Sequence, residues 1–360
     1  MDPPVPPSDL GPDRPVTPAP KGPMPRTRRR PAALAAALAL VSLIALIAAG
    51  CGGSSDGGLT HLTVALDWTP NTNHSGVYIA KDDGYYRDAG LDVTVVEPDP
   101  SGALPQLAAG NADIAFSYAE QIIPARADGS KVVSIASVMR TNTSSLVSPA
   151  DRDITRPRDL AGKTYGTFGG DIERPLVDAL VRCDGGDPST IRFVDVGNVD
   201  YAVGFRRRQF DFTWVFDGWD VIRMRDVDGM DVRTIPFRDH LRCIPDWYTP
   251  VLAATETTIA KDPEVLRRFL AATAKGYERA VADPAAAAEA IKRAAPESDM
   301  ALLAPSARFV ARFLTDARGG WGYQEPSVWK GFNAFLARSS LPHVADVAGT
   351  YTNDLLPSGS

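Results

Sequence analysis

Short apolar runs alternate with amphipathic stretches along most of the chain. Leu62, Val64 and Leu66 alternate with polar residues, as is typical of a strand, and residues 77–90 then have helical spacing. The same exchange predicts further strands at 91–95, 114–116, 132–138, 164–167, 191–194, 210–215, 232–235 and 251–254, and helices that include 104–109, 122–127 and 262–277. This alternation predicts an α/β protein with mostly parallel sheets and helices on their faces.

A break in the hydrophobic pattern divides this α/β chain into two lobes. The break lies near Ser148, where polar residues and prolines interrupt the apolar runs. We assign residues 59–145 to lobe 1, 146–248 to lobe 2, and 249–360 to a return to lobe 1 with C-terminal helices. The chain has 360 residues, of which 44% are hydrophobic, and this is enough for two such units. Two crossovers between the lobes would form a hinge beneath a cleft.

The beginning of the chain has the features of an export signal. Residues 1–30 are rich in Pro and Arg and are expected to be disordered, whereas residues 31–50 form an almost uninterrupted apolar run typical of a signal peptide. Small residues lead into Cys51, which resembles the bacterial lipobox. This resemblance implies cleavage before Cys51, a lipid on its sulfur, and a flexible tether at 51–58. A membrane-spanning anchor is the alternative, and in either case the folded body lies outside the cytoplasm.

Charge and cysteine usage restrict the possible partners. The net charge is −6, and when the six basic and three acidic residues of 1–50 are left out, 32 basic and 41 acidic residues remain. That surface would repel phosphate backbones, so we expect no nucleic-acid partner. Cys183 and Cys243 are either a disulfide pair or two small buried apolar residues. The four histidines are scattered singly, so we predict no metal site.

Candidate ligand contacts follow the first predicted strand. Ligands of open α/β sheets bind at the carboxyl ends of strands, which places this loop at the cleft. It contains Asp67, Trp68, Asn73 and His74. The alternative is a structural turn in which the Asp and Asn side chains bond their own backbone.

Two other segments run from a strand end into a helix. Ser117, Tyr118 and Glu120 offer a hydroxyl, an aromatic ring and a carboxylate, although Ser117 is equally suited to cap the helix. Gly169 and Glu173 lie in a glycine-containing segment of lobe 2 that does not match a phosphate-binding fingerprint. Glu173 either contacts a ligand or only complements the helix dipole.

Aromatic residues of lobe 2 complete the predicted cleft. Trp219, Trp247 and Tyr248 lie past strand ends or near the second crossover, whereas Phe212 and Trp214 alternate along a strand and are expected in the core. Aromatic walls with carboxylates at their edge suit a flat, nitrogen-rich heterocycle that stacks on the rings and donates hydrogen bonds at its rim.

The residues at 66–74, 84–86, 90–93, 110–113 and 248–250 resemble the solute-binding proteins for thiamine-pyrimidine precursors, a family related to sulfonate-binding proteins and fungal thiamine pyrimidine synthases. This resemblance implies a two-lobed periplasmic-binding-protein fold of type II. It also implies a formylaminopyrimidine-like ligand, no cofactor, and an ABC permease as partner. The protein would be anchored by its lipid to the outer face of the bacterial cell membrane.

The resemblance also includes other functions. A binding protein for riboflavin or a sulfonate would share the fold. The synthases use pyridoxal phosphate and consume their own histidine, and the positions of their cofactor lysine and donor histidine correspond here to Ser117 and Gln121. Their cysteine-rich cluster corresponds to residues 246–249, which contain no cysteine. Because the reactive lysine and histidine are both replaced, the sequence predicts a binding protein and not an enzyme.

Overall fold

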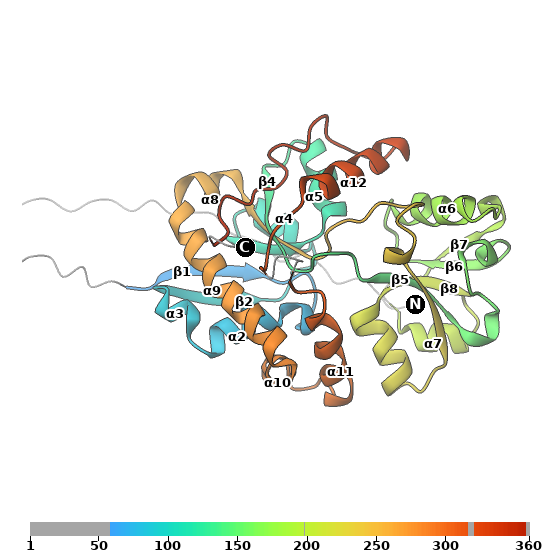
Figure 1. The fold of residues 1–360 in the computed structure, drawn as a ribbon, viewed down its shortest axis with the longest axis horizontal. Coiled ribbons are helices and arrows are strands. Elements are labelled where there is room, and N and C mark those ends of the chain that lie inside the picture. Colours follow the sequence, from blue (N-terminus) through green and yellow to red (C-terminus); the bar gives the residue numbers. More distant parts are fainter. Residues whose placement is uncertain (1–57, 198, 316–319, 358–360) are drawn as a thin grey trace, which may run out of the picture. The chain divides into compact units, whose positions relative to one another are not determined.

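Ten strands in the described part of the chain form two five-stranded sheets (Figure 1). The computed structural model describes residues 58–197, 199–315 and 320–357. The predicted extension and signal peptide, Cys51 and nearly all of the tether therefore lie outside the described residues. Within the described residues, no helix is long and apolar enough to cross a membrane.

The first sheet has the strand order β2-β1-β3-β10-β4. Its strands are β1 (Thr60–Ala65), β2 (Leu91–Val96), β3 (Ile114–Ser117), β4 (Val132–Ser137) and β10 (Val251–Thr255). The helices of this lobe are η1 (Thr72–His74), α2 (Ser75–Asp82), α3 (Tyr85–Asp88), α4 (Ala103–Ala108), α5 (Ala119–Ala127), α8 (Glu256–Lys261), α9 (Pro263–Ala282), α10 (Pro284–Ala294), α11 (Met300–Ala311) and α12 (Pro326–Arg338).

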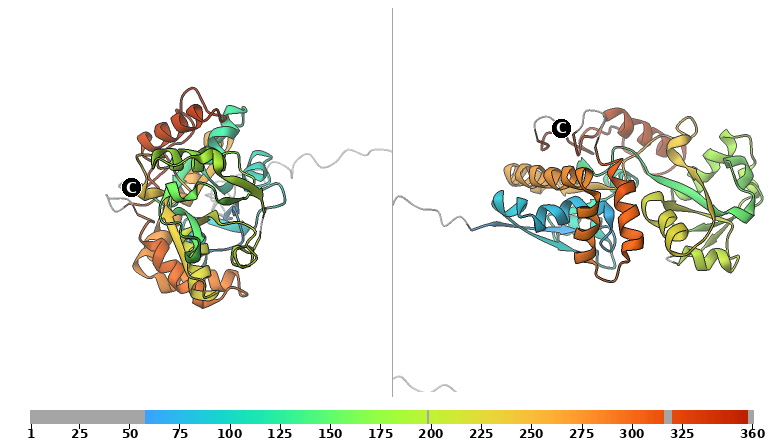
Figure 2. Two further views of the ribbon diagram at one scale, coloured as in Figure 1. Left: turned by 90° about the vertical axis from the view of Figure 1, so that its right-hand side faces the viewer. Right: turned by 60° about the horizontal axis from the view of Figure 1, so that its bottom comes forward.

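The second sheet has the equivalent order β7-β6-β8-β5-β9. Figure 2 shows this sheet in the green to yellow part of the ribbon. Its strands are β5 (Ser144–Pro149), β6 (Thr164–Thr167), β7 (Arg192–Asp195), β8 (Phe212–Phe216) and β9 (Val232–Pro236). Its helical segments are η2 (Ala150–Arg152), η3 (Pro157–Leu160), α6 (Glu173–Cys183), η4 (Pro188–Thr190), α7 (Tyr201–Arg206), the π-helical η5 (Asp217–Val221) and η6 (Arg223–Val227), and η7 (Phe237–Asp239).

The predicted α/β class is confirmed, and each sheet is mostly parallel, with four strands in one direction and one antiparallel strand. In the first sheet β10 runs antiparallel to β3 and β4, and in the second sheet β5 runs antiparallel to β8 and β9. These two strands carry the chain from one lobe to the other without a crossover helix, so they enter their sheets from the opposite end. The sequence pattern missed β5 because its serines and terminal Pro149 resemble a break.

Helices cover both faces of the first sheet. Alternate residues of β1, represented by Val64, pack with α2, α9, α10 and α11 in one buried cluster, whereas the opposite face packs with α4, α5 and α12. The second cluster continues into lobe 2 through Trp247, which stacks on Phe332 of α12 and meets Trp214 of β8 edge to face. The two lobes thus share an aromatic core beneath the strand ends.

A disulfide joins the second crossover to lobe 2. Cys183 at the end of α6 is bonded to Cys243, which lies between β9 and β10, and their Cα atoms are 5.5 Å apart. The bond restrains the segment that leads back to the first sheet, in keeping with the oxidising compartment expected from the sequence.

The close approach of α2 and α9 generates the first prediction. A Cβ atom added at Gly276 of α9 would lie 1.9 Å from the Gly76 carbonyl oxygen of α2. Gly276→Ala should therefore force the helices apart and lower the free energy of unfolding by about 2 to 3 kcal/mol, measured by chemical denaturation. Gly331→Ala in α12 is the matched control. Its Cβ meets only Pro245 at 3.8 Å, and alanine should stabilise that helix by up to about 1 kcal/mol. Equal stability of the Gly276 variant and the wild type would contradict this packing.

Candidate functional site

The candidate site lies where strand ends of the two sheets face each other. Tyr118 directly follows β3 of the first sheet and Phe216 ends β8 of the second, and their stacked rings have centroids 6.5 Å apart. Strands β1 and β6 are the parallel neighbours of β3 and β8, so the loops that follow them reach the same region. This edge of an α/β sheet is where ligands usually bind.

A buried carboxylate organises the loop after β1. Asp67 Oδ1 lies 2.6 Å from His74 Nε2, and Oδ2 accepts a hydrogen bond of 2.6 Å from the Tyr118 hydroxyl. The Asn71 backbone N–H donates to His74 Nδ1 at 3.1 Å, so a neutral His74 carries its proton on Nε2 and donates it to Asp67. Burial alone would raise the pKa of Asp67, but His74 and Tyr118 hold it below its ordinary value.

The other predicted residues of this loop have different roles. The Asn73 N–H donates to Asn71 Oδ1, and the Asn73 carbonyl oxygen accepts from the Tyr277 hydroxyl at 2.7 Å, so the Asn73 backbone fixes the loop on α9. His74 is buried with its ring edge on Phe116. Trp68, in contrast, is 44% exposed. Of the four candidates here, Trp68 is the one that offers an open aromatic face.

The segment after β3 contains Ser117, which has a hydrogen-bond partner, and Glu120, whose Oε2 has none among the described residues. The buried Ser117 hydroxyl donates to Gln121 Oε1 at 3.1 Å, one turn further along the chain. Burial raises the pKa of Glu120 to about 8, against smaller opposing effects of its backbone and of the Trp247 indole. Glu120 Oε2 and Trp247 Nε1 are buried, and neither makes a hydrogen bond of normal geometry. Glu120 is therefore largely uncharged near neutral pH and can donate as well as accept.

Glu173 was predicted either to contact a ligand or to complement the helix dipole, and the structure shows both its carboxylate oxygens hydrogen-bonded within its own lobe. The Tyr165 hydroxyl and the Phe168 N–H donate to Oε2 at 2.6 and 3.1 Å, and the Thr167 hydroxyl and Gly170 N–H donate to Oε1 at 2.9 and 2.6 Å. Four donors occupy both oxygens, so Glu173 shapes the loop after β6. The sequence could not show this, because the donors include two backbone groups.

Gly169 occupies the turn of that loop. Its φ of +102° lies in the region that favours glycine, and its N–H donates to Thr167 Oγ1. The turn leaves the side chain of Phe168 54% exposed. Phe168 was not among the predicted ligand contacts, although a large apolar residue between a strand end and two glycines is a signal that the sequence contains.

Two predicted aromatic walls are buried, which corrects their placement in the cleft. Trp247 packs among Trp214, Phe237 and Phe332, and Tyr248 packs beside Trp329. The Tyr248 hydroxyl accepts a hydrogen bond from the Glu325 N–H at 2.7 Å. Helix α12 covers both residues, and its packing position could not be predicted from the local sequence pattern. Trp219 is partly buried against the core of the first lobe.

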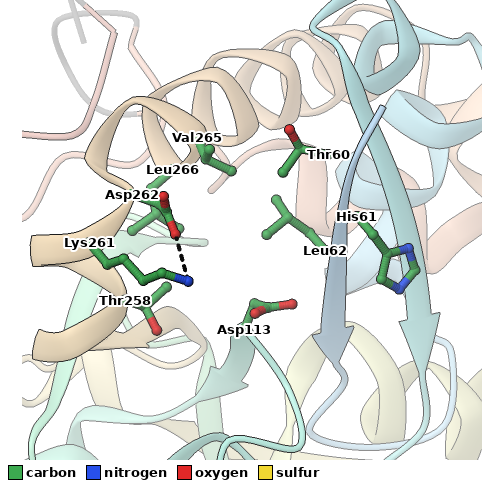
Figure 3. Close-up of a pocket in the computed structure, with 9 residues that line it drawn as sticks. All are labelled: Thr60, His61, Leu62, Asp113, Thr258, Lys261, Asp262, Val265 and Leu266. Carbon is green, nitrogen blue, oxygen red and sulfur yellow. Dashed lines mark ion pairs between the residues drawn. The ribbon is translucent and has the colours of Figure 1, made fainter. Parts of the chain in front are cut away.

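Other places for a cofactor or metal are limited within the described residues. They contain no group of three or more His, Cys, Asp or Glu side chains that could hold a metal ion. The pocket in Figure 3, of about 340 Å³, is lined by residues that include Thr60, Asp113 and Lys261. Thr60 begins β1 and Asp113 directly precedes β3, so this pocket lies at the opposite edge of the sheet from Asp67.

Comparison with known proteins places this geometry in a class. The chain has the two-lobed periplasmic-binding-protein fold. The alkanesulfonate-binding protein SsuA from Xanthomonas axonopodis pv. citri superimposes with a TM-score of 0.63 and 15% identity, over 81% of this chain and 98% of that chain. Residues 71–287 match the family described as NMT1/THI5 like, which is more than half of the chain, and the protein belongs to that family.

Two curated relatives have different functions, one as a binding protein and one as a synthase. The formylaminopyrimidine-binding protein of Halalkalibacterium halodurans is 29% identical, over 77% of this chain and 84% of that protein. The 4-amino-5-hydroxymethyl-2-methylpyrimidine phosphate synthase of Aspergillus parasiticus is 25% identical, over 63% of this chain and 69% of the synthase. The resemblance expected from the sequence is thus confirmed.

The protonation of Glu120 generates a prediction about pH. With a pKa near 8 in the folded protein and about 4.3 in the unfolded chain, Glu120 takes up a proton on folding between these two pH values. The free energy of unfolding therefore falls as the pH rises from the unfolded-state pKa to the folded-state pKa of Glu120. Glu120 makes its full contribution to stability only below the unfolded-state pKa. Glu120→Gln should remove this loss, so its melting temperature should gain several degrees relative to wild type between pH 5 and pH 8.5. Glu278→Gln on the exposed side of α9 is the control and should follow the wild-type curve. Parallel curves for all three proteins would show that Glu120 is already ionised.

Proposed function

We propose that the protein is an extracytoplasmic solute-binding lipoprotein that delivers a small aromatic heterocycle to an ABC importer. The observation that carries this proposal is the similarity to a formylaminopyrimidine-binding protein over 84% of its length, in a chain whose two lobes bring strand ends face to face. The ligand class is an aminopyrimidine, and the lobes close because the ligand contacts both.

The open groups of the site suit such a ligand. An aminopyrimidine has ring nitrogens that accept hydrogen bonds and amino hydrogens that donate them. A protonated Glu120 can do both, because its carboxyl group donates through the O–H and accepts through the other oxygen. The exposed ring of Trp68 provides a stacking surface.

The basic groups near the site favour an uncharged or cationic ligand over a sulfonate. The Arg174 guanidinium lies 3.7 Å from the centroid of the Phe193 ring, and Arg238 donates to Asp217 Oδ2 at 2.7 Å. Both guanidinium groups therefore already have a partner, an aromatic ring for Arg174 and a carboxylate for Arg238. An anion would have to compete for them, because the loops that follow β1, β3 and β6 otherwise carry acidic and neutral residues.

The side chains at the reactive positions of the synthases support binding without chemistry. Ser117 and Gln121 stand where those enzymes have the cofactor lysine and the donor histidine, and they are hydrogen-bonded to each other. A hydroxyl forms no Schiff base, and a Gln side chain has no imidazole to donate. A synthase-like activity is therefore the less favoured function for this chain.

A ligand screen tests the proposed class. The chain should be melted with formylaminopyrimidine, hydroxymethylpyrimidine, thiamine, riboflavin, taurine, nitrate or pyridoxal phosphate. A ligand present at 100 times its dissociation constant adds about 2.7 kcal/mol of stability, enough to raise the midpoint by several degrees. We expect a rise with the pyrimidines. A rise with pyridoxal phosphate alone would favour the synthase, and a rise with taurine or riboflavin alone would replace the ligand class.

A second experiment tests the membrane anchor. In a bacterial host, Cys51→Ser should abolish labelling by radioactive palmitate and release the protein from the membrane fraction, since the acyl chains provide the attachment. Ser54→Ala, which leaves Cys51 in place, is the control and should be labelled like the wild type. If the Cys51→Ser protein stayed in the membrane as fully as the control, the apolar segment 31–50 would be an uncleaved anchor.

A further inference from the structure

The two lobes present equivalent loops to each other. In the first sheet β1 lies between β2 and β3, and in the second sheet β6 lies between β7 and β8, with parallel pairing in each case. The loops after β1 and after β6 therefore occupy the same place in their lobes, and each leads into a helix of its own lobe.

Each of these loops is held by a buried carboxylate that accepts a hydrogen bond from a tyrosine. Tyr118 donates to Asp67 at 2.6 Å in lobe 1, and Tyr165 donates to Glu173 at 2.6 Å in lobe 2. All four carboxylate oxygens are occupied by groups of their own lobe. Both loops are thus fixed before any ligand arrives, which reduces the entropy lost on binding.

Each fixed loop exposes one large aromatic side chain. Trp68 is 44% exposed and Phe168 is 54% exposed, and they are the two aromatic residues among the large apolar side chains most exposed in the described chain. The Phe168 N–H is bonded to Glu173 and the following Gly169 has a left-handed φ, so the backbone that carries the ring is fixed. A rigid loop that presents such a ring to solvent offers a ligand a preformed apolar surface.

We infer that Trp68 and Phe168 form a clamp, one ring from each lobe, that closes on the two faces of a planar heterocycle. The inference rests on the proposed function, since it assigns the ligand of the same site. Strand ends of the two lobes already meet through Tyr118 and Phe216, so the loops that follow the neighbouring strands lie on the same side of the molecule. A ligand held by both rings links the lobes and favours closure.

The test compares substitutions at Trp68 and Phe168 that keep an aromatic ring with substitutions that keep only apolar area. Affinity of the full-length chain for formylaminopyrimidine should be measured by calorimetry in detergent. Phe168→Tyr keeps a flat ring and should change the dissociation constant by less than about 3-fold, whereas Phe168→Leu keeps apolar area without a flat face and should weaken binding about 10-fold. Trp68→Phe and Trp68→Leu should behave in the same way.

Controls distinguish the clamp from its alternatives. Val227 is a similarly exposed apolar residue of lobe 2, at the end of η6 that leads to the start of β9, and Val227→Ala should bind like the wild type. All five variants should melt within a degree or two of the wild type without ligand, since the altered residues are exposed. If the wild type binds and Phe168→Leu binds equally well, the clamp is wrong and the proposed function stands. If the wild type fails to bind any pyrimidine, both are wrong.

Discussion

The relation between the two lobes depends on one carboxylate in the second crossover. Asp246 accepts hydrogen bonds from the Thr141 hydroxyl at 2.6 Å and from the Asn142 N–H at 2.9 Å, both in the first crossover. It also accepts from the N–H of Trp247, whose ring belongs to the aromatic core shared by the lobes. Asp246 therefore joins the two crossovers, and the Val138 N–H also donates to the Pro250 carbonyl oxygen at 3.0 Å. Among the described residues these two crossovers are the covalent connections between the lobes, so a rotation that opens the site would bend the chain here.

Each lobe contributes one loop to the candidate site, and hydrogen bonds within the same lobe hold that loop in place. In lobe 1, Asp67 connects the loop after β1 to the segment after β3, through His74 and Tyr118. In lobe 2, Glu173 closes the loop after β6 on itself. Neither anchor needs the other lobe. The lobes can separate without loss of either half-site, and a ligand then meets two surfaces that are already formed. This arrangement suits repeated capture and release better than a loop that must fold around its ligand.

Much of the fold follows from local sequence patterns, and the failures have definite physical causes. Strands β1, β2 and β3 were predictable because Val64 and its neighbours alternate with polar residues or form short apolar runs. Strand β5 was not, because its polar side chains are buried where the lobes meet, and local pattern does not report that burial. Trp247 and Tyr248 were placed in the cleft wall, but α12 covers them, and its docking is decided by residues more than seventy positions away. The candidate loops were found because strand ends carry function in this architecture. The exposure of Phe168 depends on hydrogen bonds to its backbone that only coordinates reveal.

Within one family, the same scaffold supports a binding protein and a synthase, so the difference must lie in a few side chains. Here the anchoring carboxylates are saturated and Ser117 is paired with Gln121, which leaves no free nucleophile among the site residues. Glu120 has a buried carboxyl oxygen without a hydrogen bond among the described residues, and a group of this kind binds a ligand through hydrogen bonds. Such groups discriminate strongly, because a ligand that lacks the matching donor or acceptor leaves a buried polar atom unpaired, and a site of this kind can reject it by a factor of about 10⁴. Flat aromatic faces add affinity for many heterocycles, so the polar edge near Glu120, more than the rings, would decide which heterocycle is carried.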